Sequence, residues 1–371
     1  MNFLVLGIGN PQADLLRVLS NDYNIHALSY LSEGAGRRLV DTFKKIDIKD
    51  EQSVFEYAKL HSIDIIYSIG SDLGMVTAAA VSDRLKLPSL ITPEIARLCH
   101  NKGLLRSRLG KLDWNVEYRI LQRPSEVSRF SYPFMMKPVD SQGQRGVFLV
   151  KNEREFFKNF STSLSYSGSK RLIVEEYIEG PEISLNAYIV DAEIRFSFIS
   201  DRIVWSGFSG GIIHKHRYPS RFITIETNIR VHQLAAEVIN RIGIKNGPVY
   251  FQIKLRKNEE PKLIEVTPRL DGCHLWRLIK HATGVDLLEI TTNHLMGKIE
   301  NGFVFNNING TPNANGTWVL EFMCEKPRKE VNTNKYDTSN SLYQDWYYKD
   351  GETVIPMNTF MEKCGYQIYK T

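Results

Sequence analysis

The first hundred residues alternate short apolar runs with stretches of helical periodicity. Apolar runs of four to eight residues are typical of buried strands, and apolar positions spaced three or four apart are typical of helices. Strand alternating with helix predicts a small parallel α/β domain, which we expect to end near residue 97. The predicted strands cover residues 2–6, 25–30 and 64–69, and the predicted helices cover 12–20, 52–60 and 73–86.

The pattern changes after this region. Thr92, followed by Pro93, is a good helix start, and the helical pattern continues through Arg108. Residues 132–150 and 171–190 each predict two strands joined by a loop or turn, and an amphipathic helix follows at about 230–242. Two further strands, 249–255 and 262–267, flank a charged turn and predict a hairpin.

The end of the chain has a different character. A helix near 285–297 precedes residues 301–316, which are rich in Asn and Gly and indicate a linker. Residues 317–324 and the aromatic segment 343–348 predict a small β-rich appendage over 301–371.

Composition narrows the class of protein. The 371 residues are 42% hydrophobic and 24% charged, as in ordinary globular proteins. The net charge of +5 arises from 47 basic and 42 acidic residues without a Lys/Arg block, so neither nucleic acid nor a membrane is an expected partner. The four cysteines are far apart, no apolar run could span a membrane, and the N-terminus lacks a basic leader. We therefore expect a cytoplasmic protein with reduced thiols.

The first strand matches a nicotinamide-binding fingerprint only in part. Gly7 and Gly9 match part of a dinucleotide fingerprint, but Gln12 stands where a third small residue is needed. The preferred interpretation is a tight strand-to-helix turn.

Three segments carry candidate chemistry, and the first is PFMMKPVDSQGQRGV. Lys137 lies on an apolar strand, where its charge needs an anionic partner. In the following loop, Ser141, Gly143 and Gly146 let backbone N–H groups approach phosphate oxygens. The alternative is a glycine hairpin with a snorkelling lysine. The loop lies between strands, so it is not a Walker loop.

The second segment is LIVEEYIEGPEISL. Glu175 and Glu176 end an apolar strand, and Glu182 follows a turn at Gly180 and Pro181. Carboxylate and backbone groups there could hold an adenine amino group and ribose hydroxyls. A solvated acidic turn remains the alternative.

The third segment is the predicted hairpin. Glu265 and Thr267 lie two apart on one strand and share a face, and Gln252 lies on the other strand. Oxygen ligands converging in this way suit a hard ion such as Mg²⁺, and Arg269 beyond them could stabilise a transferring phosphoryl group. A surface hairpin with alternating polar residues is the alternative.

Together these segments closely resemble the ATP-grasp superfamily, and the ATP-binding halves of the carbamoyl phosphate synthase large chain come nearest. The likeness rests on KPVDSQGQRGV, EEYIEGPEIS, GPVYFQIKL and LIEVTPR, and it covers residues 98–300. It implies a pre-ATP-grasp, Rossmann-like domain over 1–97 and a two-subdomain ATP-grasp fold, with a lid at about 115–185. The last 70 residues are not covered.

The resemblance also implies roles by position. Lys102 and Lys137 would bind ATP phosphates, and Arg269 would steady the transferred phosphate. The basic stretch 207–220 carries His214, Lys215, His216 and Arg217, one of which is expected to bind the substrate carboxylate or acyl phosphate, with His216 as the candidate. A solvated basic loop is the alternative. Asp271, His274 and Trp276 are placed to meet the nucleophile, although a tryptophan such as Trp276 is more often a packing residue. The loop over the triphosphate would consist of Ser141, Gln142, Gly143, Arg145, Gly146 and Val147. The adenine would contact Glu175, Glu176 and Ile178, and the ribose would contact Glu182. The metal ion, Mg²⁺ or Mn²⁺, would be held by Gln252, Glu265 and Thr267.

One position departs from the family pattern. Thr267 stands where the family has Asn in E-x-N-P-R, so only Glu265 brings a formal negative charge to the metal. This departure puts a second metal ion and rapid turnover in question.

The activity that the resemblance implies is ligation of a small carboxylate to a small amine through an acyl phosphate. Phosphorylation or carboxylation of a small molecule, carbamate chemistry included, is the alternative within enzymology. A nucleotide-binding module without turnover is the alternative outside it, and Thr267 favours that reading. A homodimer is compatible with the sequence, which does not determine the oligomeric state.

Overall fold

The N-terminal part is a small parallel α/β unit. The computed structural model describes residues 1–19, 23–128, 130–207, 211–299, 316–356 and 361–371. The sheet has the strand order β3-β2-β1-β4 and is parallel. Its strands are β1 (Asn2–Leu6), β2 (Asn24–Ser29), β3 (Thr42–Lys45) and β4 (Ile65–Tyr67). The helices that connect or follow these strands are α1 (Asn10–Leu19), α2 (Glu51–Leu60) and α3 (Asp72–Leu85). The three predicted strands and three predicted helices are confirmed. Strand β3 was missed because its TFKK sequence is polar and largely exposed.

The predicted helix from Thr92 through Arg108 is two helices. They are α4 (Pro93–His100) and α5 (Lys102–Leu109). Asn101 between them is extended, with φ −96° and ψ 106°, and its side-chain oxygen accepts a hydrogen bond from the backbone N–H of Leu104. The break makes Lys102 the first residue of a new helix.

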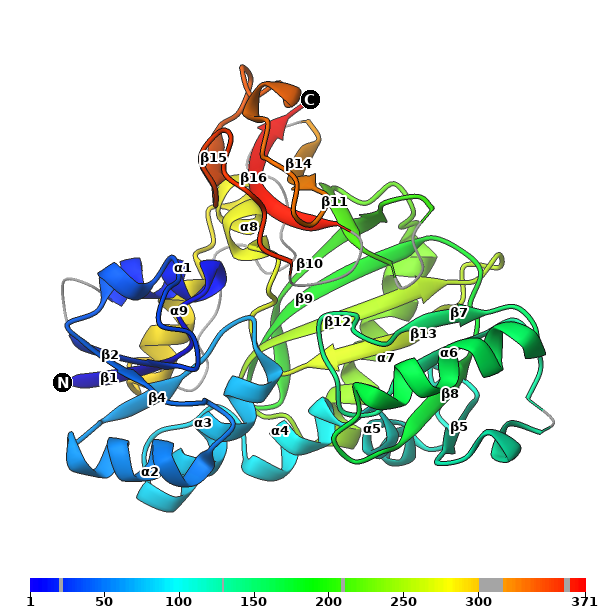
Figure 1. Cartoon of the computed structure of the whole chain (residues 1–371), viewed down its shortest axis with the longest axis horizontal. Coiled ribbons are helices and arrows are strands. Elements are labelled where there is room, and N and C mark those ends of the chain that lie inside the picture. Colours follow the sequence, from blue (N-terminus) through cyan, green and yellow to red (C-terminus); the bar gives the residue numbers. More distant parts are fainter. Residues whose placement is uncertain (20–22, 129, 208–210, 300–315, 357–360) are drawn as a thin grey trace.

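A second sheet has the order β5-β8-β6-β7 and is antiparallel throughout. Its strands are β5 (Tyr118–Leu121), β6 (Phe134–Pro138), β7 (Phe148–Val150) and β8 (Leu172–Glu176), and helix α6 (Glu153–Ser165) covers one face. Phe134 and Phe156 pack between sheet and helix with their ring centroids 6.0 Å apart. We call this unit the lid (Figure 1).

The largest sheet has eight antiparallel strands in the order β13-β12-β9-β10-β11-β14-β16-β15. Its first five in space are β13 (Pro261–Thr267), β12 (Gly247–Leu255), β9 (Glu182–Val190), β10 (Glu193–Val204) and β11 (Ile213–Tyr218). The predicted hairpin is therefore confirmed as β12 and β13. Helix α7 (Ile225–Ile242) packs on one face, and begins before residue 230 because Thr224 caps it.

The C-terminal strands extend this same sheet. They are β14 (Trp318–Glu325), β15 (Tyr343–Trp346) and β16 (Glu362–Lys370), and β14 pairs with β11 from Lys215–Glu321 to Tyr218–Trp318. The segment is β-rich as predicted, but it continues the central sheet instead of forming a separate one. Helices α8 (Leu275–Thr283) and α9 (Leu287–Leu295) lie between this region and the N-terminal domain (Figure 1). The linker expected at 301–316 lies, except for Gly316, outside the described residues, and the domain limits stay predictions.

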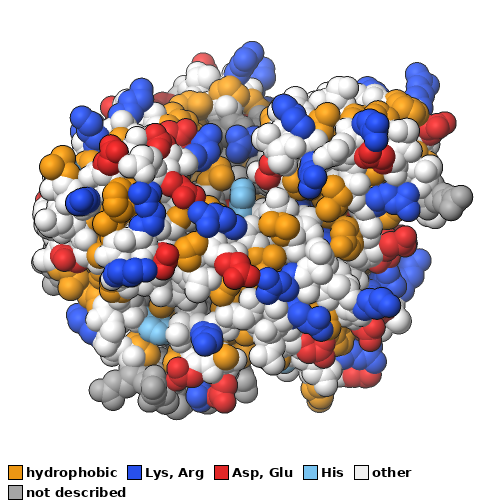
Figure 2. Space-filling model, turned by 90° about the horizontal axis from the view of Figure 1, so that it is seen from below, with side chains coloured by type: hydrophobic (Ala, Val, Ile, Leu, Met, Phe, Trp, Pro, Cys, Tyr) orange, Lys and Arg blue, Asp and Glu red, His pale blue; other side chains and the backbone are white. Residues whose placement is uncertain are grey.

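The surface gives no sign of a polyanion or membrane partner on the face that is visible. Figure 2 shows basic and acidic side chains intermingled over it, without a broad patch of one sign. Within the described residues, no helix is both long and apolar enough to cross a membrane.

Candidate functional site

The lid presents charged side chains on the face away from helix α6. Phe134, Met136 and Val174 belong to the core beneath that helix. Because side chains alternate along a strand, Lys137 and Glu175 point to the opposite face of the lid sheet.

The central sheet presents polar side chains in the same way. Phe251 and Val266 lie in the core against α7. Gln252 pairs in register with Glu265, and both, with Thr267, lie on the face opposite that core. The predicted metal ligands therefore share one face of the sheet, as expected.

A buried charge triad joins lid and central sheet. Lys137 Nζ lies 2.5 Å from Glu175 Oε2, and Arg106 Nε lies 2.7 Å from Glu175 Oε1. Arg106 also donates to the carbonyls of Leu263 and Ile264 on β13, at 2.8 and 2.9 Å. Burial alone would raise the pKa of Glu175, but the charges of Arg106 and Lys137 lower that pKa to about 2.

This triad gives Glu175 a positioning role that the sequence did not predict. Both of its carboxylate oxygens contact cations, and Glu175 thereby positions Lys137. Its contact with adenine stays a prediction. Arg106 was not identified from the sequence, because Arg106 and Arg108 both lie between Leu105 and Leu109 on α5 and nothing local distinguishes the buried one.

Lys102 lies beside the triad. Its Nζ donates to the carbonyl of Ser141 at 2.7 Å. Burial lowers the pKa of Lys102, and the neighbouring Lys137 lowers it further, whereas Glu265 and Asp72 raise it. The two lysines predicted to bind phosphate are therefore close to each other and to Glu265.

The loop predicted to cover the triphosphate bridges three parts of the molecule. Gln142 Oε1 accepts from the backbone N–H of Asp72 at 3.2 Å, and Gln144 Nε2 donates to the carbonyl of Gly211 at 2.7 Å. Arg145 Nε donates back to the carbonyl of Gln142 at 3.3 Å. The loop thus connects the lid with the N-terminal domain and with the segment at Gly211.

Two glycines shape this loop. Gly143 and Gly146 have φ of +65° and +73°, a region that side chains disfavour. A Cβ on Gly146 would lie 2.9 Å from Pro138 and 3.0 Å from Tyr166, whereas one on Gly143 would meet nothing within 4 Å. Val147 N–H closes the turn onto the carbonyl of Gln144 at 3.3 Å.

Two residues of the predicted hinge differ in exposure. Ile178 is buried, whereas Glu176 is partly exposed and its Oε2 lies 2.6 Å from Arg256 Nη2. Gly180, at φ +144°, packs so closely on the carbonyl of Leu255 that a Cβ would meet it at 1.8 Å. The turn from lid to central sheet therefore requires glycine, and the adenine contacts of Glu176 and Ile178 stay predictions.

Glu182 is tied to the central sheet. Its Oε1 accepts from Arg202 Nη1 at 2.5 Å and from Gln252 Nε2 at 2.6 Å. Arg202 also donates to the carbonyl of Gly211 at 3.1 Å. Because Gln252 donates through its amide nitrogen, its amide oxygen is the atom left for a cation. Arg202 was missed because β10 was not predicted.

The metal-ligand set fits a hard cation. The hydroxyl of Thr267 is buried and has no hydrogen-bond partner among the described residues. Glu265 forms no ion pair within 4.0 Å in the part of the chain that the structure describes. An amide oxygen, a carboxylate and an unpaired hydroxyl on one face are the donors that Mg²⁺ accepts. Gln252, Glu265 and Thr267 are therefore retained as predicted ligands.

Arg269 joins the site to the N-terminal domain. Its Nε lies 2.6 Å from Asp72 Oδ1, and its Nη1 donates to the carbonyl of Leu270 at 3.0 Å. Burial would raise the pKa of Asp72, but Arg269 lowers it, with His100 and Lys102 contributing. Asp72 was not singled out, although Ser71 and Asp72 start a helix just after a parallel strand, where binding sites often lie.

His216 is not on a mobile loop as the sequence suggested. Residues Ile213–Tyr218 form β11, and His216 is fully buried with Nδ1 3.3 Å from Ser200 Oγ. Burial lowers the pKa of His216, and the charges of Arg202 and Lys363 lower it further, so the imidazole is neutral. A neutral buried histidine cannot pair with the substrate carboxylate as a cation, which corrects that part of the expectation.

The segment after Arg269 also differs from expectation. His274 Nδ1 lies 2.8 Å from Asp14 Oδ2 on α1, and Trp276 Nε1 donates to the same oxygen at 3.1 Å. Arg277 Nη2 lies 2.5 Å from Asp14 Oδ1, and Tyr347 OH lies 2.8 Å from His274 Nε2. His274 and Trp276 therefore hold domains together and do not face a nucleophile.

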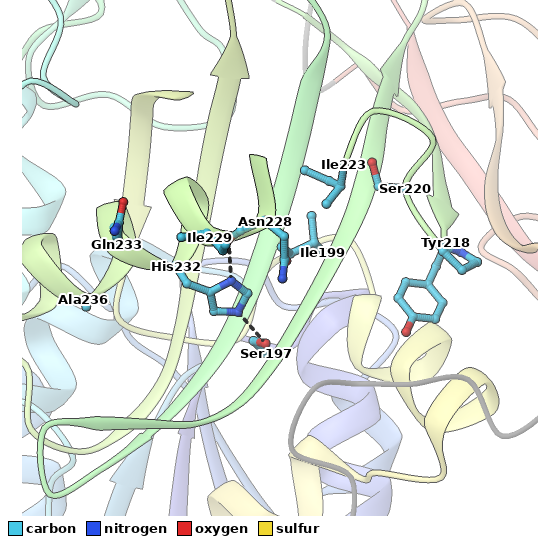
Figure 3. A pocket seen from close by; sticks show the side chains of 11 residues that line it. Ser197, Ile199, Tyr218, Ser220, Ile223, Asn228, Ile229, His232, Gln233 and Ala236 are labelled. Atoms are coloured by element: carbon cyan, nitrogen blue, oxygen red, sulfur yellow. Dashed lines mark hydrogen bonds between the residues drawn. The ribbon is translucent and has the colours of Figure 1, made fainter. Parts of the chain in front are cut away.

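A hollow of about 670 Å³ lies elsewhere, at helix α7 (Figure 3). It is lined by Ile199, Ile229 and His232, and His232 Nε2 bonds Ser197 Oγ at 2.9 Å. Ser197 and Ile199 alternate with Ser200, so they face the other side of the sheet from Gln252 and Glu265. The hollow is therefore separate from the charged site.

Comparison with known proteins shows which proteins this chain is similar to. A family model for the ATP-grasp domain matches residues 130–275. The ATP-grasp enzyme fsqD of Aspergillus fumigatus is 26% identical over 197 residues, 48% of this chain and 33% of that protein. Carnosine synthase 1 of Mus musculus is 24% identical over 327 residues, 78% of this chain and 39% of that protein.

The alanine–anticapsin ligase of Bacillus amyloliquefaciens is 24% identical over 180 residues, 43% of this chain and 37% of that protein. The chain thus spans a third to a half of the curated relatives it matches. Among solved structures, the L-amino acid ligase of Bacillus licheniformis has a TM-score of 0.79 at 15% identity, with 100% of this chain and 93% of that chain covered. The phosphoribosylglycinamide synthetase of Anaerococcus prevotii has a TM-score of 0.74 at 18% identity, with the same coverage.

Proposed function

The chain carries an ATP-grasp domain, and from that premise we propose that it is an ATP-dependent ligase joining a small carboxylate to a small amine. Relatives named alanine–anticapsin ligase and carnosine synthase, and a structural neighbour named L-amino acid ligase, support this class. Neighbours are also described as complexes with ADP and magnesium, which supports Mg-ATP as the nucleotide. We propose no nucleic acid or membrane partner.

One observation carries the proposal. Four charged side chains come from separate elements, yet each lies within electrostatic reach of another of the four. They are Lys102 on helix α5, Lys137 on strand β6, Glu265 on strand β13 and Arg269 just after that strand. Two lysines and an arginine beside a carboxylate form the charge arrangement that a triphosphate with its metal ion requires.

The site residues have different roles in the first step, which is the transfer of the γ-phosphoryl group to the acid. Lys102 and Lys137 bind phosphate oxygens, and Arg269 stabilises the charge on the transferred group. Glu265, Gln252 and Thr267 would hold Mg²⁺, which supplies charge neutralisation at the phosphates when it is bound. A carboxylate oxygen of the acid attacks the γ-phosphorus, the bond to the β-phosphate oxygen breaks, and ADP leaves.

The second step makes the amide. The amine nitrogen attacks the acyl carbon, the C–O bond to phosphate breaks, and inorganic phosphate leaves as the nitrogen loses a proton. Positioning and charge stabilisation account for catalysis of this kind, and no covalent intermediate with the protein is required.

The proposal is tested by incubating the full chain with Mg-ATP and pools of acids and amines. Release of ADP that requires both an acid and an amine is the expected result. Tight ATP binding without turnover on any pool would favour the non-catalytic module, and ADP release with bicarbonate alone would favour carboxylation or carbamate chemistry.

Two variants connect activity to the site. Lys137→Gln and Glu265→Gln should each weaken Mg-ATP binding about tenfold or more in calorimetry, because a charge-assisted contact contributes roughly 1.5–3 kcal/mol. Lys151→Gln, an exposed lysine just after β7, is the control and should bind ATP normally. Unchanged affinity in both site variants contradicts the proposed nucleotide site.

A further inference from the structure

A second group of polar side chains lies beyond Arg269 on the same face of the central sheet. We call His216 on β11, Asp271 and Cys273 after β13, and Lys363 on β16 the polar cluster. One ligand atom each from His216, Asp271 and Cys273 lies within 4.8 Å of the others. Lys363 Nζ lies 3.4 Å from Cys273 Sγ.

The polar cluster contains buried atoms without partners. His216 Nε2 and Asp271 Oδ2 have no hydrogen-bond partner among the described residues, although both side chains are at least 97% buried, at 0% and 3% exposed. Buried polar atoms are nearly always paired, so each unpaired one indicates a missing ligand or water. Cys273 and Lys363 are partly exposed, which leaves the cluster open on one side.

The charges in the polar cluster favour a zwitterionic organic ligand, which carries a positive and a negative group. Lys363 stacks 3.8 Å from the ring centroid of Phe322 and has no carboxylate partner within the described residues. A metal cation bound by His216, Asp271 and Cys273 would lie beside Lys363 and near Arg202, and that repulsion disfavours it. A ligand with an anionic group that pairs with Lys363 and a hydrogen-bond donor that reaches Asp271 would satisfy both side chains.

Asp271 lies near the phosphate end as well as near Lys363, because the charges of Arg269 and of Lys363 both act on it. A ligand whose amino group meets Asp271 and whose carboxylate meets Lys363 would therefore have its nitrogen within electrostatic reach of Arg269, where the acyl phosphate would form.

We propose that the polar cluster binds the amine substrate as an amino acid, with its carboxylate held by Lys363 and its amino group at Asp271 Oδ2. This inference rests on the proposed ligase function. It makes Lys363 a residue that determines specificity, and it gives the C-terminal strand β16 a part in the site.

The test measures selectivity between an amino acid and the amine that lacks its carboxylate, such as alanine and ethylamine, with one acid partner. The wild type should prefer the amino acid. Lys363→Gln should lower the ratio of the two kcat/KM values at least tenfold, and Lys363→Arg should retain most of it. Lys370→Gln, on the same strand with its ammonium 5.4 Å from the Trp318 ring centroid, is the matched control.

Trapping with hydroxylamine separates this inference from the function itself. Hydroxylamine intercepts an acyl phosphate without needing the polar cluster, so Lys363→Gln should form hydroxamate at the wild-type rate. Absence of ADP and hydroxamate with every acid means that the ligase function fails.

Three results overturn the polar cluster as an amino acid site while the ligase stands. One is an unchanged selectivity ratio in Lys363→Gln, and another is a wild-type preference for the plain amine. The third is stoichiometric Zn²⁺ that the wild type retains and Cys273→Ser loses, which would assign a metal site.

Discussion

Buried charges at the site are held by partners from distant parts of the chain. Glu175 lies between Lys137 and Arg106, and Asp72 pairs with Arg269. Removing a charge from water costs several kcal/mol, and only an opposite charge at good geometry repays that cost. The cations needed for phosphate are therefore fixed in place before any nucleotide arrives.

Glu175→Gln should remove the centre of the triad. We expect a loss of about 3–5 kcal/mol in the free energy of unfolding, because two buried cations lose their common anion. Urea denaturation followed by circular dichroism measures it. Glu176→Gln, which breaks a partly exposed pair with Arg256, should cost no more than about 1 kcal/mol.

The same carboxylate predicts a pH dependence. The pKa of Glu175 falls from 4.5 to about 2 on folding, so its contribution is fully present above pH 4.5 and is lost as the pH falls toward 2. The wild type should lose stability over that window in urea titrations. Glu175→Gln should show a shallower decline there, and equal slopes would contradict the assignment.

At the residue scale, the sequence predicted which face of a strand a side chain lies on, but it did not predict which side chains that residue contacts. Alternation along β12 and β13 placed Gln252 and Glu265 correctly. The partners of Glu175 could not be predicted, because Arg106 is 69 residues away in the chain and its contact depends on how the lid docks.

Among the elements, the loop between β6 and β7 has the most direct link to function. Its hydrogen bonds through Gln142 and Gln144 reach the N-terminal domain and the segment at Gly211. The contacts are few and made by side chains, so the loop can exchange them for contacts with phosphate at little cost.

Gly146→Ala should disturb this loop more than Gly143→Ala. Both substitutions place a side chain at positive φ, which costs about 1–2 kcal/mol. Only the Cβ at residue 146 would also crowd Pro138 and Tyr166. We expect Gly146→Ala to raise the KM for ATP severalfold and Gly143→Ala to change it less, as steady-state ADP release would measure. An equal effect at both positions would contradict this packing argument.

Element boundaries were predictable where local signals were strong. The Gly243 stop defines the end of α7, and the charged turn defines the β12–β13 hairpin, whereas the start of α7 after the Thr224 cap was predicted too late. Strand β11 was interpreted as loop because His214, Lys215 and Arg217 are polar on both faces. Those side chains are satisfied by Glu321 and Asp201, which no local pattern reveals.

At the scale of the whole molecule, Asp14 joins the N-terminal domain to the segment at helix α8. It accepts from His274, Trp276 and Arg277, and through His274 it connects to Tyr347 near the C-terminus. The side chain of Asp14 is fully buried. Contacts across such distances in sequence cannot be predicted from local patterns, so the sequence suggested His274 as a substrate contact, whereas the packing role considered for Trp276 agrees with its burial.

Asp14→Asn should loosen the docking of the N-terminal domain. We expect about 3–5 kcal/mol of destabilisation, because Arg277 and His274 lose a buried anion. Hydrogen exchange should then rise together in α1 and α8. Asp83→Asn, which breaks an exposed pair with Lys86, is the control and should leave both unchanged. Exchange rising in α1 alone would contradict a shared anchor.

The pairing of β14 with β11 has a consequence for how proteins of this fold could diversify. Without the terminal strands, β11 would be an open edge, whose free N–H and C=O groups invite association with other chains. The added strands close that edge and at the same time bring new side chains to the far end of the sheet. Exchanging them could retune which molecule is accepted there while the nucleotide end stays intact.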